Sequence, residues 1–320
     1  MSYTDERQVM TRAAWMYYNE GLTQEEIGER LGFSRVTINR LLQRAHERGI
    51  IEHRINTSGV EHVELESALR QRFHLHDAVV TLAVEPGDTE VLYAVLARTT
   101  SDWLMAHLKA GMRVGLGMGR TLSHLPEYFS PPSPIDCTFA EVVGGAAAPA
   151  GGFTAYNVTS KMAELAGGRP EYLYAPVLAS SEAVRLSIMQ EPAVAQALER
   201  ARRSDILIQS VGPVDASALL YLHGHLQAEE LQALQDRGAV GDMLGRYFDA
   251  QGVPISNPVS DRVIGLSLAE VARIPLSLVM AGGPEKVPVL LAAMHGRLFN
   301  VLITDAWTAE QLLSEVPDVI

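Results

Sequence analysis

The chain has 320 residues, of which 47% are hydrophobic and 20% charged, and its net charge of −12 is compatible with a soluble globular protein containing a small domain and one large core. Its single cysteine, Cys137, excludes an internal disulfide and a cysteine-based zinc site. No apolar run approaches membrane-spanning length and no signal-peptide pattern is present, so we expect a cytoplasmic protein with no membrane partner.

Two features near the start of the chain predict a small helical head. An amphipathic helix is predicted for residues 6–19, and residues 22–42 (LTQEEIGERLGFSRVTINRLL) have the pattern of a helix-turn-helix. Thr23 and Glu26 have the spacing of a capping box, in which each side chain bonds the backbone N–H of the other residue. Gly32 supplies the positive φ of the turn.

The second helix of this motif presents polar residues suited to the DNA major groove. Ser34 is expected to cap it, while Ile38, Leu41 and Leu42 return to the core at helical spacing. Arginine, threonine and asparagine near a helix start suit base readout, although a helical hairpin with a solvated basic face is the alternative. The residues assigned to DNA contact are Ser34, Arg35, Thr37, Asn39, Arg40 and Arg44.

A short connection follows the head. Residues 50–55 (IIEHRI) form either a wing or a simple exit strand, and the sequence leaves both interpretations open. Residues 61–73 (EHVELESALRQRF) predict an amphipathic linker helix that packs on the large domain or on its copy in a dimer. The predicted organisation is a helix-turn-helix domain over residues 1–56, a linker helix within residues 57–76, and an effector and oligomerisation domain over residues 77–320.

The negative charge is distributed unevenly between these parts. Residues 1–56 carry eight arginines and eight acidic residues, so this block is neutral. Residues 57–320 carry 18 basic and 30 acidic residues, which accounts for the whole excess. We therefore expect the large domain to stay away from DNA, while the arginines of the head contact phosphates or guanine edges.

Apolar runs alternate with amphipathic helices from residue 77 onward, which predicts a doubly wound α/β domain with a mostly parallel sheet covered on both faces. The predicted strands are 78–84, 112–117, 139–143, 172–177, 206–211, 263–266, 276–280 and 301–304. The predicted helices are 89–109, 155–166, 182–202, 228–236, 285–297 and 308–315.

A glycine-rich turn after the second of these strands is the first candidate ligand site. Ligands of doubly wound sheets collect beyond the carboxyl ends of the strands. In the run 115–121 (GLGMGRT), Gly117 and Gly119 let the backbone approach an anion, and Arg120 and Thr121 follow them. The run is neither a Walker loop nor a dinucleotide fingerprint, and glycines needed only for a tight turn are the alternative explanation.

Three further residues are assigned to the same sheet edge. Lys286 follows a second glycine turn, Asp242 is placed to accept hydrogen bonds from sugar hydroxyls, and Arg262 precedes a predicted strand. Together with the glycine turns, these residues predict a phosphorylated or polyhydroxylated small ligand. Taken singly, each cation is more often a surface residue. The histidines are scattered, so we expect no metal, no cofactor and no catalytic residue.

The whole chain, from about Thr11 to Thr304, resembles the sorbitol-operon regulator (SorC) family of sugar-responsive bacterial transcription regulators. The resemblance rests on the segments GLTQEEIGERLGFSRVTINRLL, VGLGMGRTL, VVGG, SDILIQSVGPV, GAVGDMLGRYFDAQG, DRVIGLSL and AGGPEKVPVLLAAMHGRLFNVLITD. It implies an effector domain similar to sugar-phosphate isomerases and deaminases, with an effector site at the 117–121 turn, Asp242, Arg262 and Lys286. It also implies a homodimer or homotetramer.

These observations predict a DNA-binding regulator of a carbohydrate-metabolism operon that is not an enzyme. Its partners would be double-stranded operator DNA and a sugar phosphate or related polyol. The alternatives are a sugar-phosphate isomerase or deaminase fused to a DNA-binding head, and a regulator that senses an unphosphorylated sugar or alditol.

Overall fold

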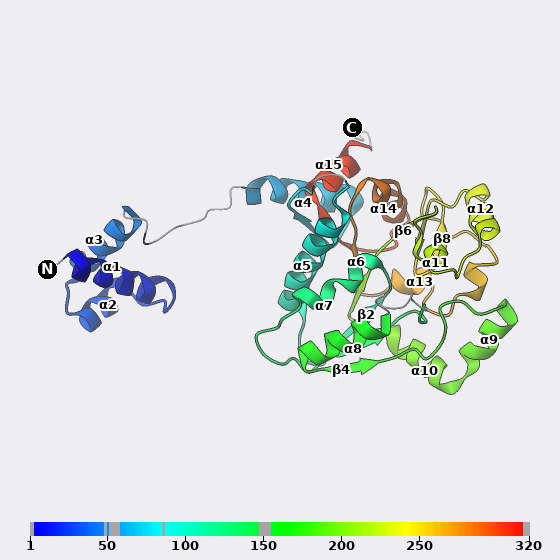
Figure 1. Cartoon of the computed structure of the whole chain (residues 1–320), viewed down its shortest axis with the longest axis horizontal. Helices are drawn as coiled ribbons and strands as arrows, with labels where there is room; N and C mark the ends of the chain where they lie inside the picture. The colour runs from blue at the N-terminus through cyan, green and yellow to red at the C-terminus, as the bar shows by residue number, and fades with distance from the viewer. Residues whose placement is uncertain (1–2, 48–49, 51–57, 85–86, 147–154, 316–320) are drawn as a thin grey trace. The chain divides into compact units, whose positions relative to one another are not determined.

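The computed structural model describes residues 3–47, 50, 58–84, 87–146 and 155–315. The chain divides into two compact units, residues 1–57 and residues 58–320 (Figure 1). Within the described ranges, no helix combines the length and apolar character needed to cross a membrane. The predicted wing or exit strand, apart from Ile50, lies outside the described residues.

The first unit contains three helices, α1 (Tyr3–Tyr18), α2 (Gln24–Leu31) and α3 (Arg35–Glu47). Its core is built from one face of each helix, because apolar residues recur at helical spacing. The fully buried members of this core are Met10, Ala13, Ile27, Ile38 and Ala45.

Local signals set the boundaries of the helix-turn-helix, as the sequence predicts. Oε2 of Glu26 accepts a hydrogen bond from the backbone N–H of Thr23 at 2.8 Å, and Oγ1 of Thr23 accepts one from the N–H of Glu26 at 3.3 Å. Gly32 ends α2 with a φ of +75°. A Cβ on Gly28 would lie 2.6 Å from the carbonyl oxygen of Phe33, so only glycine fits where the turn approaches α2. The predicted helix-turn-helix is confirmed.

Helix α4 (Ser58–Phe73) is the first element of the second unit. Leu69 and Phe73 are buried in the main core of that unit, and α4 contacts strand β1 and helix α15. Oε1 of Glu66 accepts a hydrogen bond from the backbone N–H of Val80 at 2.9 Å. Val63, nearer the start of the helix, is 56% exposed. The end of α4 thus packs into the core of the second unit, while Val63 is open to solvent.

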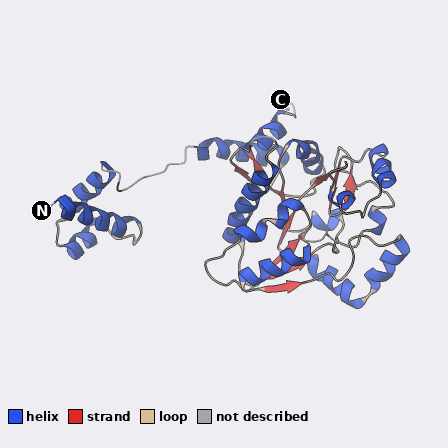
Figure 2. Cartoon of the chain, in the orientation of Figure 1, coloured by secondary structure: helices blue, strands red, loops and turns tan. Residues whose placement is uncertain are grey.

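The second unit is built on a seven-stranded parallel sheet, which confirms the predicted α/β fold. Alternate residues of β10 contribute to two cores, with Leu302 in one and Val301 and Ile303 in the other, so both faces of the sheet are covered (Figure 2). In spatial order the strands are β1 (Asp77–Thr81), β10 (Val301–Asp305), β9 (Leu276–Met280), β5 (Ile206–Gln209), β2 (Arg113–Leu116), β3 (Thr138–Glu141) and β4 (Arg169–Glu171).

Helices and short helical turns connect and cover these strands. They are α5 (Thr89–His107), α6 (Arg120–Ser123), α7 (Leu125–Tyr128), α8 (Ala155–Ala166), α9 (Glu182–Gln190), α10 (Pro192–Ala201), α11 (Leu219–Leu222), α12 (Ala228–Asp236), η1 (Ser260–Arg262), α13 (Leu268–Val271), η2 (Pro284–Lys286), α14 (Val287–His295) and α15 (Ala306–Ser314).

Several predicted elements were wrong. The single helix expected over residues 182–202 is two helices, because Pro192 lacks the N–H that would continue α9. Residues 263–266 make only isolated bridges, from Val263 to Leu178 and from Gly265 to Val143. The strand expected at 172–177 is instead the short β4 just before it.

A small antiparallel sheet, which the sequence analysis did not predict, is formed by β6 (Gly212–Pro213), β7 (Gly241–Met243) and β8 (Arg246–Phe248). Gly212 pairs with Asp242, so this sheet links the segment after β5 to the β7–β8 hairpin. It therefore brings a residue of the predicted ligand site next to the carboxyl edge of the main sheet.

The order of the strands creates a switch point beside β2. From β2 the chain continues outward through β3 and β4, and then returns to β5 on the other side of β2. Leu116 and Ile208 are register partners, so β2 and β5 end at the same edge. In open α/β sheets, ligands bind outside the carboxyl ends of strands at such a point. A ligand is therefore expected to bind at the turns after β2 and β5.

Candidate functional site

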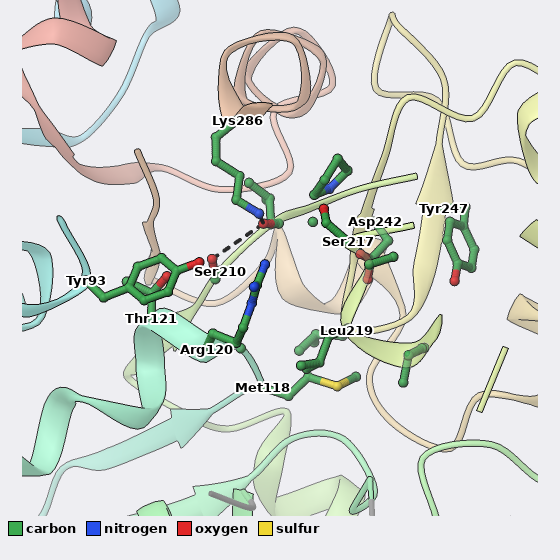
Figure 3. A pocket seen from close by; sticks show the side chains of 17 residues that line it. Tyr93, Met118, Arg120, Thr121, Ser210, Ser217, Leu219, Asp242, Tyr247 and Lys286 are labelled. Atoms are coloured by element: carbon green, nitrogen blue, oxygen red, sulfur yellow. Dashed lines mark hydrogen bonds between the residues drawn. The ribbon is translucent and has the colours of Figure 1, made fainter. Parts of the chain in front are cut away.

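A pocket that is open to solvent lies at this switch point (Figure 3). Its walls come from the turn after β2, the segment after β5, the small sheet, α5 and the turn before α14. The lining residues include Tyr93, Gly119, Arg120, Thr121, Ser210, Val211, Asp242 and Lys286.

The turn after β2 is shaped by its two glycines. A Cβ on Gly117 would lie 2.8 Å from Cδ2 of Leu244 and 3.0 Å from Cβ of Gln209, so a side chain does not fit there. Gly119 has a φ of +151°, which favours glycine. Gly117 thus packs the turn against β5 and the small sheet, while Gly119, Arg120 and Thr121 line the pocket.

Lys286 is a buried cation on the pocket wall. Its side chain is directed toward the segment after β5 in Figure 3, and Nζ donates a hydrogen bond to the carbonyl oxygen of Val211 at 2.9 Å. The residue is 7% exposed, and burial lowers the pKa of its amino group. An ammonium group has three N–H donors, so two remain for a ligand.

Asp242 lies in β7 and supplies the carboxylate of the pocket. Its Oδ2 accepts a hydrogen bond from the backbone N–H of Gly245 at 3.0 Å. A Cβ at Gly212 would collide with Oδ1 of Asp242, so that glycine is required for the two segments to meet. Burial raises the pKa of Asp242 from 3.8 to about 6, against the opposing effects of the Gly245 hydrogen bond and the charge of Lys286.

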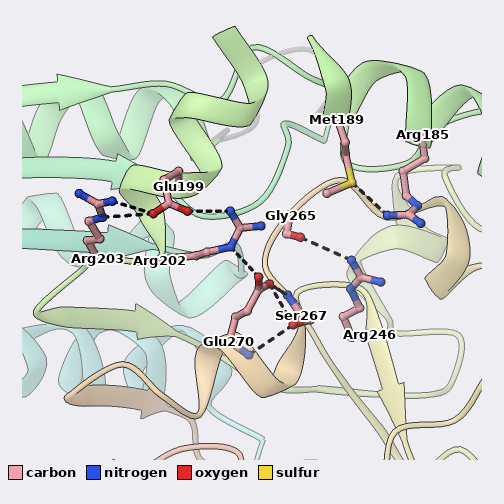
Figure 4. A network of polar contacts seen from close by, with 9 residues as sticks. All are labelled: Arg185, Met189, Glu199, Arg202, Arg203, Arg246, Gly265, Ser267 and Glu270. Carbon is pink, nitrogen blue, oxygen red and sulfur yellow. Dashed lines mark hydrogen bonds and ion pairs between the residues drawn. The ribbon is translucent and has the colours of Figure 1, made fainter. Parts of the chain in front are cut away.

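Arg246 anchors the small sheet that carries Asp242. Its Nη1 donates to the carbonyl oxygen of Ser260 at 2.8 Å and its Nη2 to that of Val263 at 3.2 Å. Figure 4 shows this guanidinium directed toward Gly265, in the segment that bridges to the end of β3. Burial lowers the pKa of Arg246. These bonds fix β8, and through it β7, relative to the main sheet.

The structure brings five of the seven predicted effector residues to the pocket lining, with Gly117 packed behind it. Arg262 is the exception. Its Nη2 pairs with Oε1 of Glu230 on α12, and its Nε donates to the carbonyl oxygen of Pro258 at 3.3 Å. Its guanidinium is therefore engaged outside the pocket, and Arg262 does not line the pocket with the other predicted effector residues.

Many of the other lining residues were not assigned to the site from the sequence, and Tyr93 and Ser210 are two of them. Tyr93 lies near the start of α5, where it follows the buried Leu92 and has the appearance of another core residue. Ser210 directly follows β5, and its position after a buried strand was the available signal. Within the described part of the chain, no group of three or more His, Cys, Asp or Glu side chains is arranged to hold a metal ion.

The candidate DNA-reading helix is α3. Oγ of Ser34 accepts a hydrogen bond from the backbone N–H of Thr37 at 3.2 Å and lies 2.8 Å from Oγ1 of Thr37, as expected for a helix cap. Oδ1 of Asn39 accepts from Nε2 of Gln24 at 3.4 Å. The predicted DNA-contact residues Ser34, Arg35, Asn39, Arg40 and Arg44 are exposed, whereas Thr37 is half-buried.

Comparison with known proteins accounts for both units. Residues 59–314 match the Sugar-bind family, a sugar-binding domain, and residues 13–58 match the MarR family. The chain is 31% identical over 316 residues to the transcriptional regulator LsrR of Enterobacter sp., covering 97% of this chain and 94% of that protein. It is 29% identical to the deoxyribonucleoside regulator of Bacillus subtilis, covering 98% and 99% of the two chains.

The fold agrees with a solved structure across nearly the whole length. The full-length sorbitol operon regulator SorC from Klebsiella pneumoniae superposes with a TM-score of 0.77 at 26% sequence identity, covering 96% of this chain and 98% of that chain. The protein is thus a transcriptional regulator with a helix-turn-helix and a sugar-binding domain, and it belongs to the SorC family.

Proposed function

We propose that this regulator controls a carbohydrate-metabolism operon and that its operator affinity changes when a sugar phosphate or related polyol occupies the switch-point pocket. One observation carries the proposal: Arg120, Asp242 and Lys286, from three separate segments, line one pocket at the carboxyl edge of the sheet. The carbohydrate class is supported by relatives named for sorbitol and for deoxyribonucleosides.

The charges of the pocket suit a ligand with an anionic and a hydroxylated end. Since residues 57–320 are strongly acidic, an anion needs a local cationic site to overcome the general repulsion. Among the described residues, no carboxylate pairs with Arg120, and Lys286 keeps two donors. Asp242, across the pocket in Figure 3, accepts hydrogen bonds from hydroxyl groups.

We infer that α3 enters the major groove of the operator. Arg35, Thr37 and Asn39 lie in its first two turns, where recognition helices meet base edges. Arg40 and Arg44 then contact phosphates or a guanine. Ser34 caps the start of the helix. Its hydroxyl shares a hydrogen bond with the hydroxyl of Thr37, so each of these groups already has one partner within the protein.

We also infer that heads are paired in a homodimer or homotetramer. One head recognises only a few base pairs, and pairing across half-sites raises affinity and specificity. Val63 of α4, which is 56% exposed, is available for contact with a second copy. A monomer at micromolar concentration in light scattering, with and without operator DNA, would contradict this inference.

Incubation of the full chain with a panel of sugar phosphates and the matching free sugars and alditols tests the ligand class. Each mixture is monitored for a thermal shift and for chemical turnover. We expect a sugar phosphate to raise the melting temperature without being converted. A shift only with free alditols would remove the phosphate from the proposal, and turnover would make the protein an enzyme fused to a DNA-binding head.

A further inference from the structure

Tyr93 presents an unused hydroxyl to the pocket. The residue belongs to α5, is 4% exposed and lines the pocket, where its ring lies on the side opposite Asp242 (Figure 3). Among the described residues, none makes a hydrogen bond with its phenol. The residue as a whole is buried while its hydroxyl opens on the pocket, so the phenol is available to a ligand that binds there.

The ring of Tyr93 also contacts the guanidinium of Arg120. Cζ of Arg120 lies 5.9 Å from the ring centroid, within the range of a cation–π interaction. Burial raises the pKa of Tyr93, with Glu285 and Glu90 adding to the effect and Arg120 opposing it. The phenol therefore stays protonated at neutral pH and acts as a hydrogen-bond donor next to a cation.

We propose that Tyr93 is a specificity-determining residue, whose hydroxyl donates a hydrogen bond to an anionic oxygen of the ligand while its ring positions Arg120 against the same group. The pairing of a neutral donor with a guanidinium favours phosphate oxygens over sugar hydroxyls, because hydrogen bonds to charged acceptors are the stronger ones. Tyr93 thus selects phosphorylated ligands over their free sugars. This inference rests on the proposed function.

The test measures ligand affinity by calorimetry with inorganic phosphate and with two pairs, glucitol 6-phosphate against glucitol and ribose 5-phosphate against ribose. The two test variants are Tyr93→Phe and Arg120→Gln. The control is Tyr174→Phe, which also removes one phenol hydroxyl. Tyr174 is 77% exposed and does not line the pocket. Tyr93→Phe keeps the buried ring, and its melting temperature without ligand shows that the fold is intact.

We expect Tyr93→Phe to bind the phosphorylated probe that fits the pocket roughly tenfold more weakly, while its affinity for the free sugar changes less than about twofold. Tyr174→Phe should match the wild type. Phosphate binding that is weakened in Arg120→Gln but unchanged in Tyr93→Phe would overturn the role of Tyr93 alone. An equal loss for phosphorylated and free ligands would also overturn it. If the wild type binds a free sugar or alditol but no phosphorylated probe, this inference is overturned and the proposed function is reduced to a polyol-sensing regulator. If it binds none of the probes, both are overturned.

Discussion

Nζ of Lys286, before α14, donates a hydrogen bond to the carbonyl oxygen of Val211, after β5, at 2.9 Å. The bond joins two pocket walls that are 75 residues apart in the chain. It also holds a buried ammonium group in place before any ligand arrives, which reduces the ordering required when an anion binds.

Replacement of Lys286 by methionine should weaken the binding of the effector about tenfold or more. Methionine keeps most of the apolar side chain but removes a charge-assisted contact, which contributes on the order of 1.5–3 kcal/mol. Calorimetry with the best ligand of the panel measures the effect. The control is Lys161→Met, because Lys161 is exposed on α8 and pairs with Glu164. Equal affinity in the two variants would place the anion site elsewhere.

Arg262→Gln should leave the affinity for the effector unchanged. The guanidinium of Arg262 is paired with Glu230 and bonded to the carbonyl of Pro258, and it does not line the pocket. The same titration checks this expectation, with Lys286→Met as the variant that responds. A tenfold loss of ligand affinity in Arg262→Gln would show that Arg262 leaves Glu230 and reaches the ligand.

Asp242 should make the stability of the second unit depend on pH. Because its folded-state pKa is about 6 rather than 3.8, the folded protein holds a proton that the unfolded chain releases between these values. The carboxyl group thus contributes stability that is present below pH 3.8 and is lost as the pH rises through about 6. The full contribution is at most about 3 kcal/mol.

Urea unfolding of the wild type and Asp242→Asn at about pH 4 and about pH 7 isolates this effect. Glu141, whose pKa burial raises to about 7, acts in the same direction but is present in both proteins. We expect the wild type to lose stability relative to the variant as the pH rises. A constant difference between the two proteins would mean that Asp242 titrates normally.

Two arginines of α3 should differ in their effect on DNA binding. Arg35→Ala should cost about 1–3 kcal/mol and relax specificity at one base position, whereas Arg40→Ala should weaken all sequences alike and reduce the salt dependence. Gel shifts with operator variants at several salt concentrations distinguish the two roles. Arg30→Ala is the control, because Arg30 on α2 pairs with Glu20 at 3.3 Å. If all three variants bind like the wild type, α3 is not the reading helix.

The head was predictable because its signals are local. The capping box of Thr23 and Glu26 and the turn at Gly32 act within a few residues, so the sequence specifies the helix boundaries directly. The parallel sheet was predictable from long buried runs. In contrast, β7 and β8 have three residues each, too few for a periodic pattern, so the antiparallel sheet carrying Asp242 was missed.

Contacts between distant segments limited the prediction of the site. Arg262 and Lys286 both lie next to strands that the sequence predicts. In the structure, however, Arg262 pairs with Glu230, whereas Lys286 lines the pocket. Tyr93 could not be separated from its buried neighbours on α5, because helical periodicity does not show which buried residue lines a cavity.

The coupling between the pocket and the DNA-binding head tests the central claim most directly. An operator fragment is first selected from random-sequence DNA with the full chain, and its affinity is measured by fluorescence anisotropy with and without the best sugar phosphate. We predict that the ligand changes the operator affinity of the wild type at least about tenfold, within the usual range of allosteric coupling. Lys286→Met should bind the operator normally without ligand and lose this response. An operator affinity that no ligand changes, or a full response in Lys286→Met, would contradict the account.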